Sequence, residues 1–252
     1  MVHTDRPGDP SRRTAVTVGA LFLVALVPFM IGRAIYGPAT GSADFLTDAY
    51  PDRGAVTVGV LIEFVAVLAI PLIAVFLFPV LKRVHEALAL AYVGFRALEA
   101  LLLIVIEAKV LSLIDLSDTH LNGVDSDATR LQTIGDSVLA EIDAVFSLYV
   151  LVFAVGAMIF YGLLYRSVLV PRWLSGWGFV ASAWMLVGVV LILLGTFSGS
   201  SEGALEAVFV LPLPLNEIAL ALWLILKGFR RSPEPTGADR SADRVTAPAL
   251  TG

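Results

Sequence analysis

The stretch Gly94–Lys109, GFRALEALLLIVIEAK, places an arginine and two glutamates inside an otherwise apolar run. It belongs to a longer segment, Ala87–Ile114, which exceeds the roughly 20 apolar residues that a helix needs to cross a bilayer. Backbone polar groups inside lipid must be satisfied within the segment itself, so we expect it to be helical. The stretch therefore predicts a membrane helix with ionisable side chains at hydrocarbon depth.

The whole chain has the composition of a membrane protein. Of its 252 residues, 58% are hydrophobic and 15% are charged, whereas soluble domains average about 45–50% apolar and about 25% charged residues. Arginine exceeds lysine, and alanine and valine are abundant, which is typical of proteins from GC-rich bacteria. The absence of cysteine excludes disulfides, thiolate metal sites and cysteine nucleophiles. We therefore expect a multi-pass protein of the bacterial plasma (inner) membrane, in contact with the lipid bilayer.

Six segments are long and apolar enough to span a membrane, which predicts an all-α, polytopic bundle of six transmembrane helices. The expected spans are Ala15–Tyr36, Ala55–Leu81, Ala87–Ile114, Ser137–Tyr165, Trp173–Gly195 and Leu205–Lys227. They form one domain, 15–231, between a cytoplasmic tail, 1–14, and a proline-rich tail, 232–252, that we expect to be disordered. The first span is longer than the apolar core of a signal peptide, about 7–15 residues, which favours its retention.

The charges of the connecting loops predict the orientation of the bundle. Positive residues mark the cytoplasmic side of a membrane protein. They occur before the first span, after the second, fourth and sixth, and include Arg12, Arg13, Lys82, Arg83, Arg166, Arg172, Lys227 and Arg230. The alternate loops are acidic, and the longest of them, Asp115–Asp136, is expected to be a solvated loop. Both termini are therefore expected in the cytoplasm.

Ionisable side chains inside the spans form the candidate site. At about 100° per residue, Tyr92, Arg96, Glu99, Leu103 and Glu107 fall on one face of the third helix. Glu63 lies about 12 Å into the second helix and Glu217 about 18 Å into the sixth, and Asp143 lies in the upper part of the fourth. A charge at mid-helix costs about 2.5–3.5 kcal/mol on insertion scales, so these side chains should face inward. We expect an intramembrane polar cluster of Glu63, Arg96, Glu99, Asp143 and Glu217.

Two interpretations of this cluster stay open. Arg96, taken as the cation near the bilayer centre, can pair with Glu99 at i+3 and with one more glutamate, which would tie helices together. Alternatively the carboxylates mark a proton or substrate path, since a carboxylate without a partner in low dielectric takes up a proton. A water-accessible cavity at the cluster would favour transport or catalysis, and tight packing would favour a structural role.

The stretch Phe160–Phe179, FYGLLYRSVLVPRWLSGWGF, resembles a bacterial membrane-protein family called domain of unknown function 4386. The resemblance includes ALAYVGFRALEA at Ala89–Ala100 and LPLPLNEIALALWLILKGF at Leu211–Phe229, and covers roughly Arg13 to Arg231. It implies a six-helix integral membrane protein and supplies no catalytic residues.

The same stretch has a physical interpretation as a cytoplasmic interface motif, comprising Arg166, Pro171, Arg172, Trp173 and Trp177. Proline is tolerated at a helix start, and tryptophan and arginine gather at membrane interfaces. The simplest role is an anchor at the headgroups. The alternative is a docking surface for a cytoplasmic partner or an anionic lipid.

Several function classes lack the residues that they need. The three histidines, His3, His85 and His120, lie outside the expected spans, so we expect no metal, haem or other cofactor. Neither a P-loop nor a dinucleotide-binding motif occurs, and nothing indicates nucleic-acid binding.

The leading expectation is a non-enzymatic integral membrane protein with a structural or regulatory role. A small proton- or cation-coupled transporter is the alternative, and a membrane-embedded enzyme is third. Six helices form only a small pore, so transport would favour a homo-oligomer. Pro212 and Pro214 free backbone carbonyls just before Glu217, which is either an ordinary kink or part of a cation site.

Overall fold

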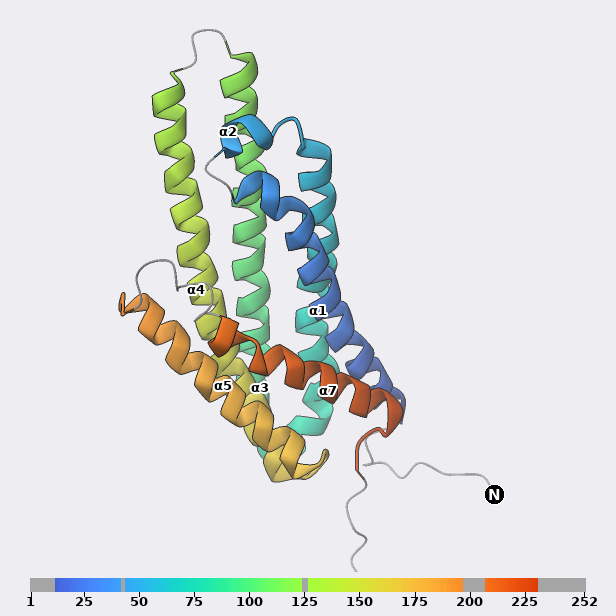
Figure 1. The fold of residues 1–252 in the computed structure, drawn as a ribbon. Helices are drawn as coiled ribbons and strands as arrows, with labels where there is room; N and C mark the ends of the chain where they lie inside the picture. Colours follow the sequence, from blue (N-terminus) through green and yellow to red (C-terminus); the bar gives the residue numbers. More distant parts are fainter. Residues whose placement is uncertain (1–11, 42–43, 124–126, 197–206, 231–252) are drawn as a thin grey trace, which may run out of the picture.

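The structure, a computed structural model, describes residues 12–41, 44–123, 127–196 and 207–230, and these residues form helices and no strands (Figure 1). The expected tails, 1–14 and 232–252, lie outside the described residues except for 12–14. The helices are α1 (Arg12–Thr40), α2 (Phe45–Asp48), α3 (Arg53–Asn122), α4 (Ala128–Ser167), α5 (Arg172–Leu193) and α7 (Pro212–Leu226). Five helices of the described residues are long and apolar enough to cross a membrane: α1, α3, α4, α5 and Ala207–Leu226, which includes α7.

Helix α3 reverses its direction at His85. The backbone of His85 is extended (φ −163°, ψ 106°), and the two arms, 53–84 and 86–122, run antiparallel in Figure 1. The His85 ring accepts a hydrogen bond from the Leu88 N–H at 3.3 Å, as the side chain of a helix N-cap does. The two expected spans therefore lie in the two arms of α3, Ala55–Leu81 in the first and Ala87–Ile114 in the second. The arms meet at His85, in the basic connector.

The prediction of a loop over Asp115–Asp136 is wrong, because most of its described residues are helical. Helix α3 continues to Asn122, and α4 begins at Ala128. The 40 residues of α4 extend about 60 Å at 1.5 Å per residue, twice the roughly 30 Å thickness of bilayer hydrocarbon. Side-chain hydrogen bonds support these polar turns, from Asn122 to Asp118 and from Gln132 to Asp136. The helices therefore project past the apolar belt.

The short helix α2 fills the space between these projecting ends. The Phe45 ring is fully buried, and a Cβ placed on Gly135 of α4 would lie only 1.9 Å from it. The Ser117 hydroxyl of α3 donates to the Leu46 carbonyl at 2.8 Å and accepts from the Tyr50 N–H at 2.9 Å. The contacts hold the segment between α1 and α3 against α3 and α4.

The opposite end brings both described chain ends together. Arg12 donates to the carbonyls of Leu224 and Leu226 at 3.5 and 3.4 Å, which joins the start of α1 to the end of α7. The Arg230 N–H donates to the Leu169 carbonyl at 2.7 Å, in the connector between α4 and α5. In Figure 1 α7 crosses the lower half of the bundle toward the start of α1.

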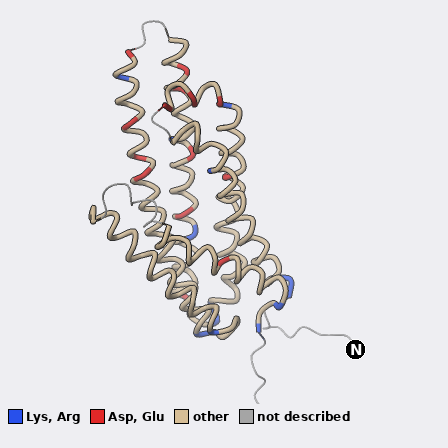
Figure 2. Tube along the Cα trace, in the orientation of Figure 1, with Lys and Arg blue, Asp and Glu red and all other residues tan. Residues whose placement is uncertain are grey.

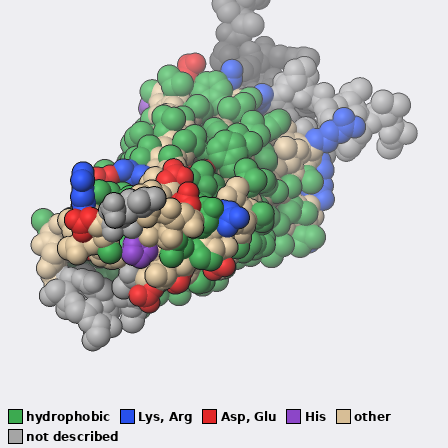
Figure 3. Space-filling view, turned by 90° about the horizontal axis from the view of Figure 1, so that it is seen from above, with side chains coloured by type: hydrophobic (Ala, Val, Ile, Leu, Met, Phe, Trp, Pro, Cys, Tyr) green, Lys and Arg blue, Asp and Glu red, His purple; other side chains and the backbone are tan. Residues whose placement is uncertain are grey.

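The surface separates into a charged end and an apolar flank. Figure 2 shows acidic residues gathered toward the upper end and basic residues toward the lower end. In Figure 3, seen from above, charged and polar side chains cover the near end and hydrophobic side chains cover the flank. Large apolar side chains on this exterior are exposed, among them Leu61 (62%), Leu101 (59%) and Val180 (67%). Such a surface suits a lipid environment.

Candidate functional site

One face of the second α3 arm is buried along its length. Tyr92, Arg96, Glu99, Leu103 and Glu107 are each at most 4% exposed. Their spacing of three and four residues places them in a single row on a helix. The intervening Leu101 and Ile104 are exposed on the lipid-facing side. The row therefore carries three ionisable groups into the interior of the bundle.

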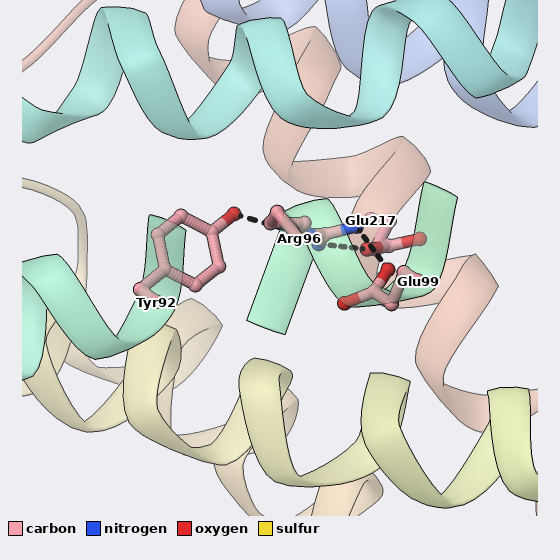
Figure 4. Close-up of polar contacts among 4 residues, drawn as sticks. All are labelled: Tyr92, Arg96, Glu99 and Glu217. Carbon is pink, nitrogen blue, oxygen red and sulfur yellow. Dashed lines mark hydrogen bonds and ion pairs between the residues drawn. The ribbon is translucent and has the colours of Figure 1, made fainter. Parts of the chain in front are cut away.

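The lower half of the row forms what we call the Arg96 cluster: Tyr92, Arg96, Glu99 and Glu217 (Figure 4). Arg96 donates from Nε to the Tyr92 hydroxyl at 3.1 Å, from Nη1 to Glu99 Oε2 at 3.1 Å and from Nη2 to Glu217 Oε1 at 3.5 Å. Glu217 comes from α7, so the arginine links two helices that are far apart in the sequence. All three guanidinium nitrogens have an acceptor, which is the condition for keeping a charge in low dielectric.

The upper half of the row meets a second group, the Arg33 cluster: Arg33, Tyr36, Glu63 and Glu107. Arg33 Nε donates to Glu63 Oε1 at 3.3 Å, and the Tyr36 hydroxyl donates to Glu63 Oε2 at 2.6 Å. Glu107 is 4% exposed and lies within electrostatic range of both Glu63 and Arg33. Among the described residues, neither Glu107 Oε1 nor Arg33 Nη2 has a hydrogen-bond partner.

The two clusters have the same composition. Each contains one arginine, two glutamates and one tyrosine, and each joins an arm of α3 to a different helix: α7 below and α1 above. Glu99 and Glu107 are eight residues apart, which is about 12 Å along a helix. Leu103, fully buried, lies between them on the same face.

Aromatic rings connect the two arginines. Arg33 lies over the rings of Phe29 and Phe146, at 4.9 and 4.3 Å from their centroids. Tyr149 stacks against both rings at 6.2 and 5.6 Å, and against Phe153 at 6.1 Å. The Arg96 guanidinium carbon in turn lies 5.4 Å from the Phe153 centroid. These rings favour cations on their faces.

A cavity of about 100 Å³ opens beside this aromatic wall. Arg96 and Glu217 provide its charged lining, and the rest is apolar or aromatic, with Phe29, Tyr149 and Phe153 among the lining residues. Glu217 accepts from Arg96 through Oε1, and no other hydrogen bond to its carboxylate occurs among the described residues. The cavity is therefore a mainly apolar space with one carboxylate, that of Glu217, in its wall.

The expected single cluster is wrong for Glu63. Its partners are Arg33 and Tyr36, and no contact joins it to Arg96 among the described residues. The sequence-based prediction considered Arg96 alone as a cation for the cluster. It did not include Arg33, the one charged residue inside the expected first span, Ala15–Tyr36. Its i, i+3 spacing with Tyr36 was the available signal. Asp143 is exposed, and its carboxylate belongs to neither cluster's ion pairs.

The expected interface motif runs from the last turn of α4, which holds Arg166, through the connector to the first turns of α5. Pro171 is buried as the N-cap of α5, and Arg166 and Arg172 are exposed. Trp173 and Trp177 are 61% and 38% exposed. The connector turns at Val168, whose φ of 55° is left-handed.

The protein itself supplies a hydrogen-bond donor to one of the backbone carbonyls that the prolines of the last span free. Pro212 and Pro214 have no N–H, so backbone carbonyls one turn earlier lose their helical donor. One of these, the Val208 carbonyl, accepts a hydrogen bond from Trp184 Nε1 at 3.2 Å. Below the kink, Asn216 donates to the Leu174 carbonyl at 3.0 Å and fastens α7 to α5. The Val208 carbonyl is thus occupied by the protein, which favours the interpretation as a kink.

Comparison with known families agrees with the resemblance drawn from Phe160–Phe179. The family described as "Domain of unknown function (DUF4386)" matches residues 17–228. The chain belongs to this family. The DUF4386 match includes both ion-pair clusters and the cavity. No match was found among curated proteins or among solved structures.

Proposed function

We propose that this DUF4386 protein is a small proton-coupled transporter whose working group is the Arg96 cluster. The observation that carries the proposal is that Arg96 and Glu217, both deeply buried, line a cavity of about 100 Å³. Ionisable groups at membrane depth that border a cavity are the usual marks of an ion or substrate path. A purely structural ion pair would need no open space beside it.

Charge balance supplies the coupling to protons. In each cluster one guanidinium faces two carboxylates, so full ionisation leaves one uncompensated negative charge in low dielectric. Such a charge is costly, and a proton or another cation removes the cost. In the Arg96 cluster the group that exchanges this proton is Glu217, since its ion pair is the longer one and it borders the cavity.

The surroundings of Glu217 determine when it binds the proton. The groups that interact with it electrostatically are Arg96, Glu99 and Tyr92 on α3 and Tyr149 and Tyr161 on α4. The neighbouring α1 and α5 present apolar side chains to the cavity, Phe22 and Met185. Arg96 favours the ionised carboxylate, whereas Glu99 opposes it. The proton therefore binds or leaves according to whether the Arg96–Glu217 contact holds.

The proposal includes six spans, with both termini in the cytoplasm of a bacterial cell. The break at His85 divides α3 into two arms that each exceed the about 20 residues of a span. Basic residues gather at the end that holds Arg12, Lys82, Arg166 and Arg230, which the positive-inside rule assigns to the cytoplasm. In this orientation the interface motif, Trp173 included, anchors α5 at the inner headgroups.

Proton flux into proteoliposomes tests the proposal. The parent protein should carry protons down a pH gradient, measured with a trapped pH-sensitive dye. Glu217→Gln should reduce the flux to that of empty liposomes, because an amide cannot exchange a proton. Glu99→Gln should reduce it as well, because Arg96 then balances the charge of Glu217 alone and keeps this carboxylate ionised. Glu86→Gln, the same change at an exposed position in the connector, is the control and should keep the parent flux. Unchanged flux in both cluster variants, or no flux from the parent, would overturn the transporter.

A structural or regulatory role is the second candidate, and one observation favours it. Glu63 and Glu99 are fully buried and ion-paired, and neither is among the residues that line the cavity. In that case the clusters would only specify how α1 and α7 pack on α3, and interhelical polar contacts of this kind contribute modestly. Normal folding with no flux from the parent is the result that this role predicts.

A further inference from the structure

We infer that the cavity beside Glu217 binds a small organic cation with a compact, apolar-substituted ammonium head. This inference names a substrate class for the proposed transporter. Only the statement that the cation is moved across the membrane rests on the proposed function. The binding itself rests on three features of the cavity: its charge, its walls and its size.

The charge of the site favours a cation. Two carboxylates and one guanidinium leave a surplus negative charge when both carboxylates are ionised, and Glu217 is the carboxylate that lines the cavity. The guanidinium nitrogens of Arg96 already have acceptors in Tyr92, Glu99 and Glu217. An anionic ligand would have to displace one of these acceptors and would add a negative charge to a site that already has one in excess.

The walls favour an organic cation over a metal ion. Phe29, Phe146, Tyr149 and Phe153 line the cavity. Three of these rings already have a guanidinium over their faces: Phe29 and Phe146 that of Arg33, and Phe153 that of Arg96. A ring face attracts an alkylammonium group and is most effective when water is excluded. A hard metal ion would instead need several oxygen ligands, and no group of three metal-ligating side chains occurs among the described residues.

The size of the cavity limits the bound group. Its volume of about 100 Å³ is smaller than an engineered cavity of about 150 Å³ that holds benzene. A trimethylammonium head is of this compact kind, and the rest of a longer ligand would have to extend out of the cavity. Binding of the cation replaces the proton on Glu217, so one proton leaves for each monovalent cation that enters. The net charge of the site is the same before and after this exchange.

A charge series on one molecular shape tests the inference. The ligands are choline, its uncharged isostere 3,3-dimethylbutan-1-ol and the anion 3,3-dimethylbutanoate. Binding to the purified full chain is measured by calorimetry in maltoside micelles, which contain no ammonium groups. Choline should bind at least about tenfold more tightly than the alcohol, and the anion least tightly. Glu217→Gln should weaken choline binding by at least about tenfold and leave the affinity for the alcohol unchanged, while Glu86→Gln should leave both affinities unchanged.

A second measurement needs only the parent protein. Titrations of choline in buffers of different ionisation enthalpy should show release of a proton on binding, and the alcohol should show none. Equal affinities for the three ligands, the tightest binding by the anion, no binding of choline, or choline binding without proton release would each overturn the inference. Because micelles carry no gradient, choline binding without proton flux in liposomes, measured both with and without a choline gradient, would refute only the transporter. Flux without choline binding would refute only this ligand class.

Discussion

At the scale of single residues, Arg96 is the group on which the interior depends. It is 3% exposed and compensates two carboxylates that are themselves buried. Removing one partner of a buried ion pair leaves an unpaired charge, which costs more than the pair contributes. Arg33 has the corresponding position in the upper cluster, but its side chain is 29% exposed, whereas that of its partner Glu63 is fully buried.

Arg96→Gln should therefore destabilise the protein strongly, by about 3–5 kcal/mol if the buried carboxylates stay ionised. A second change, Glu99→Gln on the same background, should restore part of the stability because it removes one of the two unpaired charges. Thermal unfolding in micelles measures both effects. Arg166→Gln, at an exposed position, is the matched control and should unfold like the parent. If Arg96→Gln unfolded like this control, the cluster would not stabilise the bundle.

At the scale of helices, close approach between α1 and the first α3 arm positions the Arg33 cluster. A Cβ on Gly32 would lie 2.5 Å from the Gly59 carbonyl oxygen and 2.8 Å from the Glu63 Cβ, so only glycine permits this crossing. Small residues at such crossings let membrane helices pack by van der Waals contact. The same contact places Arg33 within reach of Glu63.

Gly32→Ala should lower the unfolding midpoint, since overpacking costs about 1–3 kcal/mol and exceeds the gain of about 1 kcal/mol from helix propensity. Gly94→Ala is the control, because an added Cβ there meets no atom within 4 Å. It should be neutral or slightly stabilising. Thermal unfolding in micelles again measures the difference, and equal stability of the two variants would show that the α1–α3 crossing tolerates a wider separation.

At the scale of the whole molecule, the reversal at His85 sets the topology. Arg83 precedes the reversal, and Ala128 begins α4 at the far end of the second α3 arm. Basic residues gather toward the end of the molecule with the reversal, and acidic residues toward the opposite end (Figure 2). An uninterrupted helix of 70 residues would extend about 105 Å, far more than a bilayer with its headgroups. The reversal at His85 divides the helix into two arms, each of a length that suits one crossing of the bilayer.

Because the chain has no cysteine, single cysteines can report this topology without background. In intact cells a membrane-impermeant maleimide should label Ala128→Cys, and it should label Arg83→Cys only after permeabilisation. Leu101→Cys, on the lipid-facing side at 59% exposure, should resist labelling in both conditions. Labelling of Arg83→Cys and Ala128→Cys from the same side would contradict the reversal.

The amino-acid sequence alone determined the class of the protein, its family and the burial of one face of α3. These follow from local properties: apolar runs long enough to span lipid, the quoted motif of Phe160–Phe179, and the period of 3.6 residues that aligns Tyr92 with Glu107. It also indicated that Glu99 pairs with Arg96, since neighbours at i+3 lie on one face.

Only the tertiary structure decided which glutamate meets which arginine. From the sequence, Glu63 and Glu217 were both plausible partners for Arg96. The crossing at Gly32 and Gly59 brings Glu63 to Arg33, and the crossing of α7 brings Glu217 to Arg96. The cavity likewise arises between side chains of several helices. Depth is read along one helix, whereas pairing depends on the rotation and approach of two helices, which packing of the complete bundle determines.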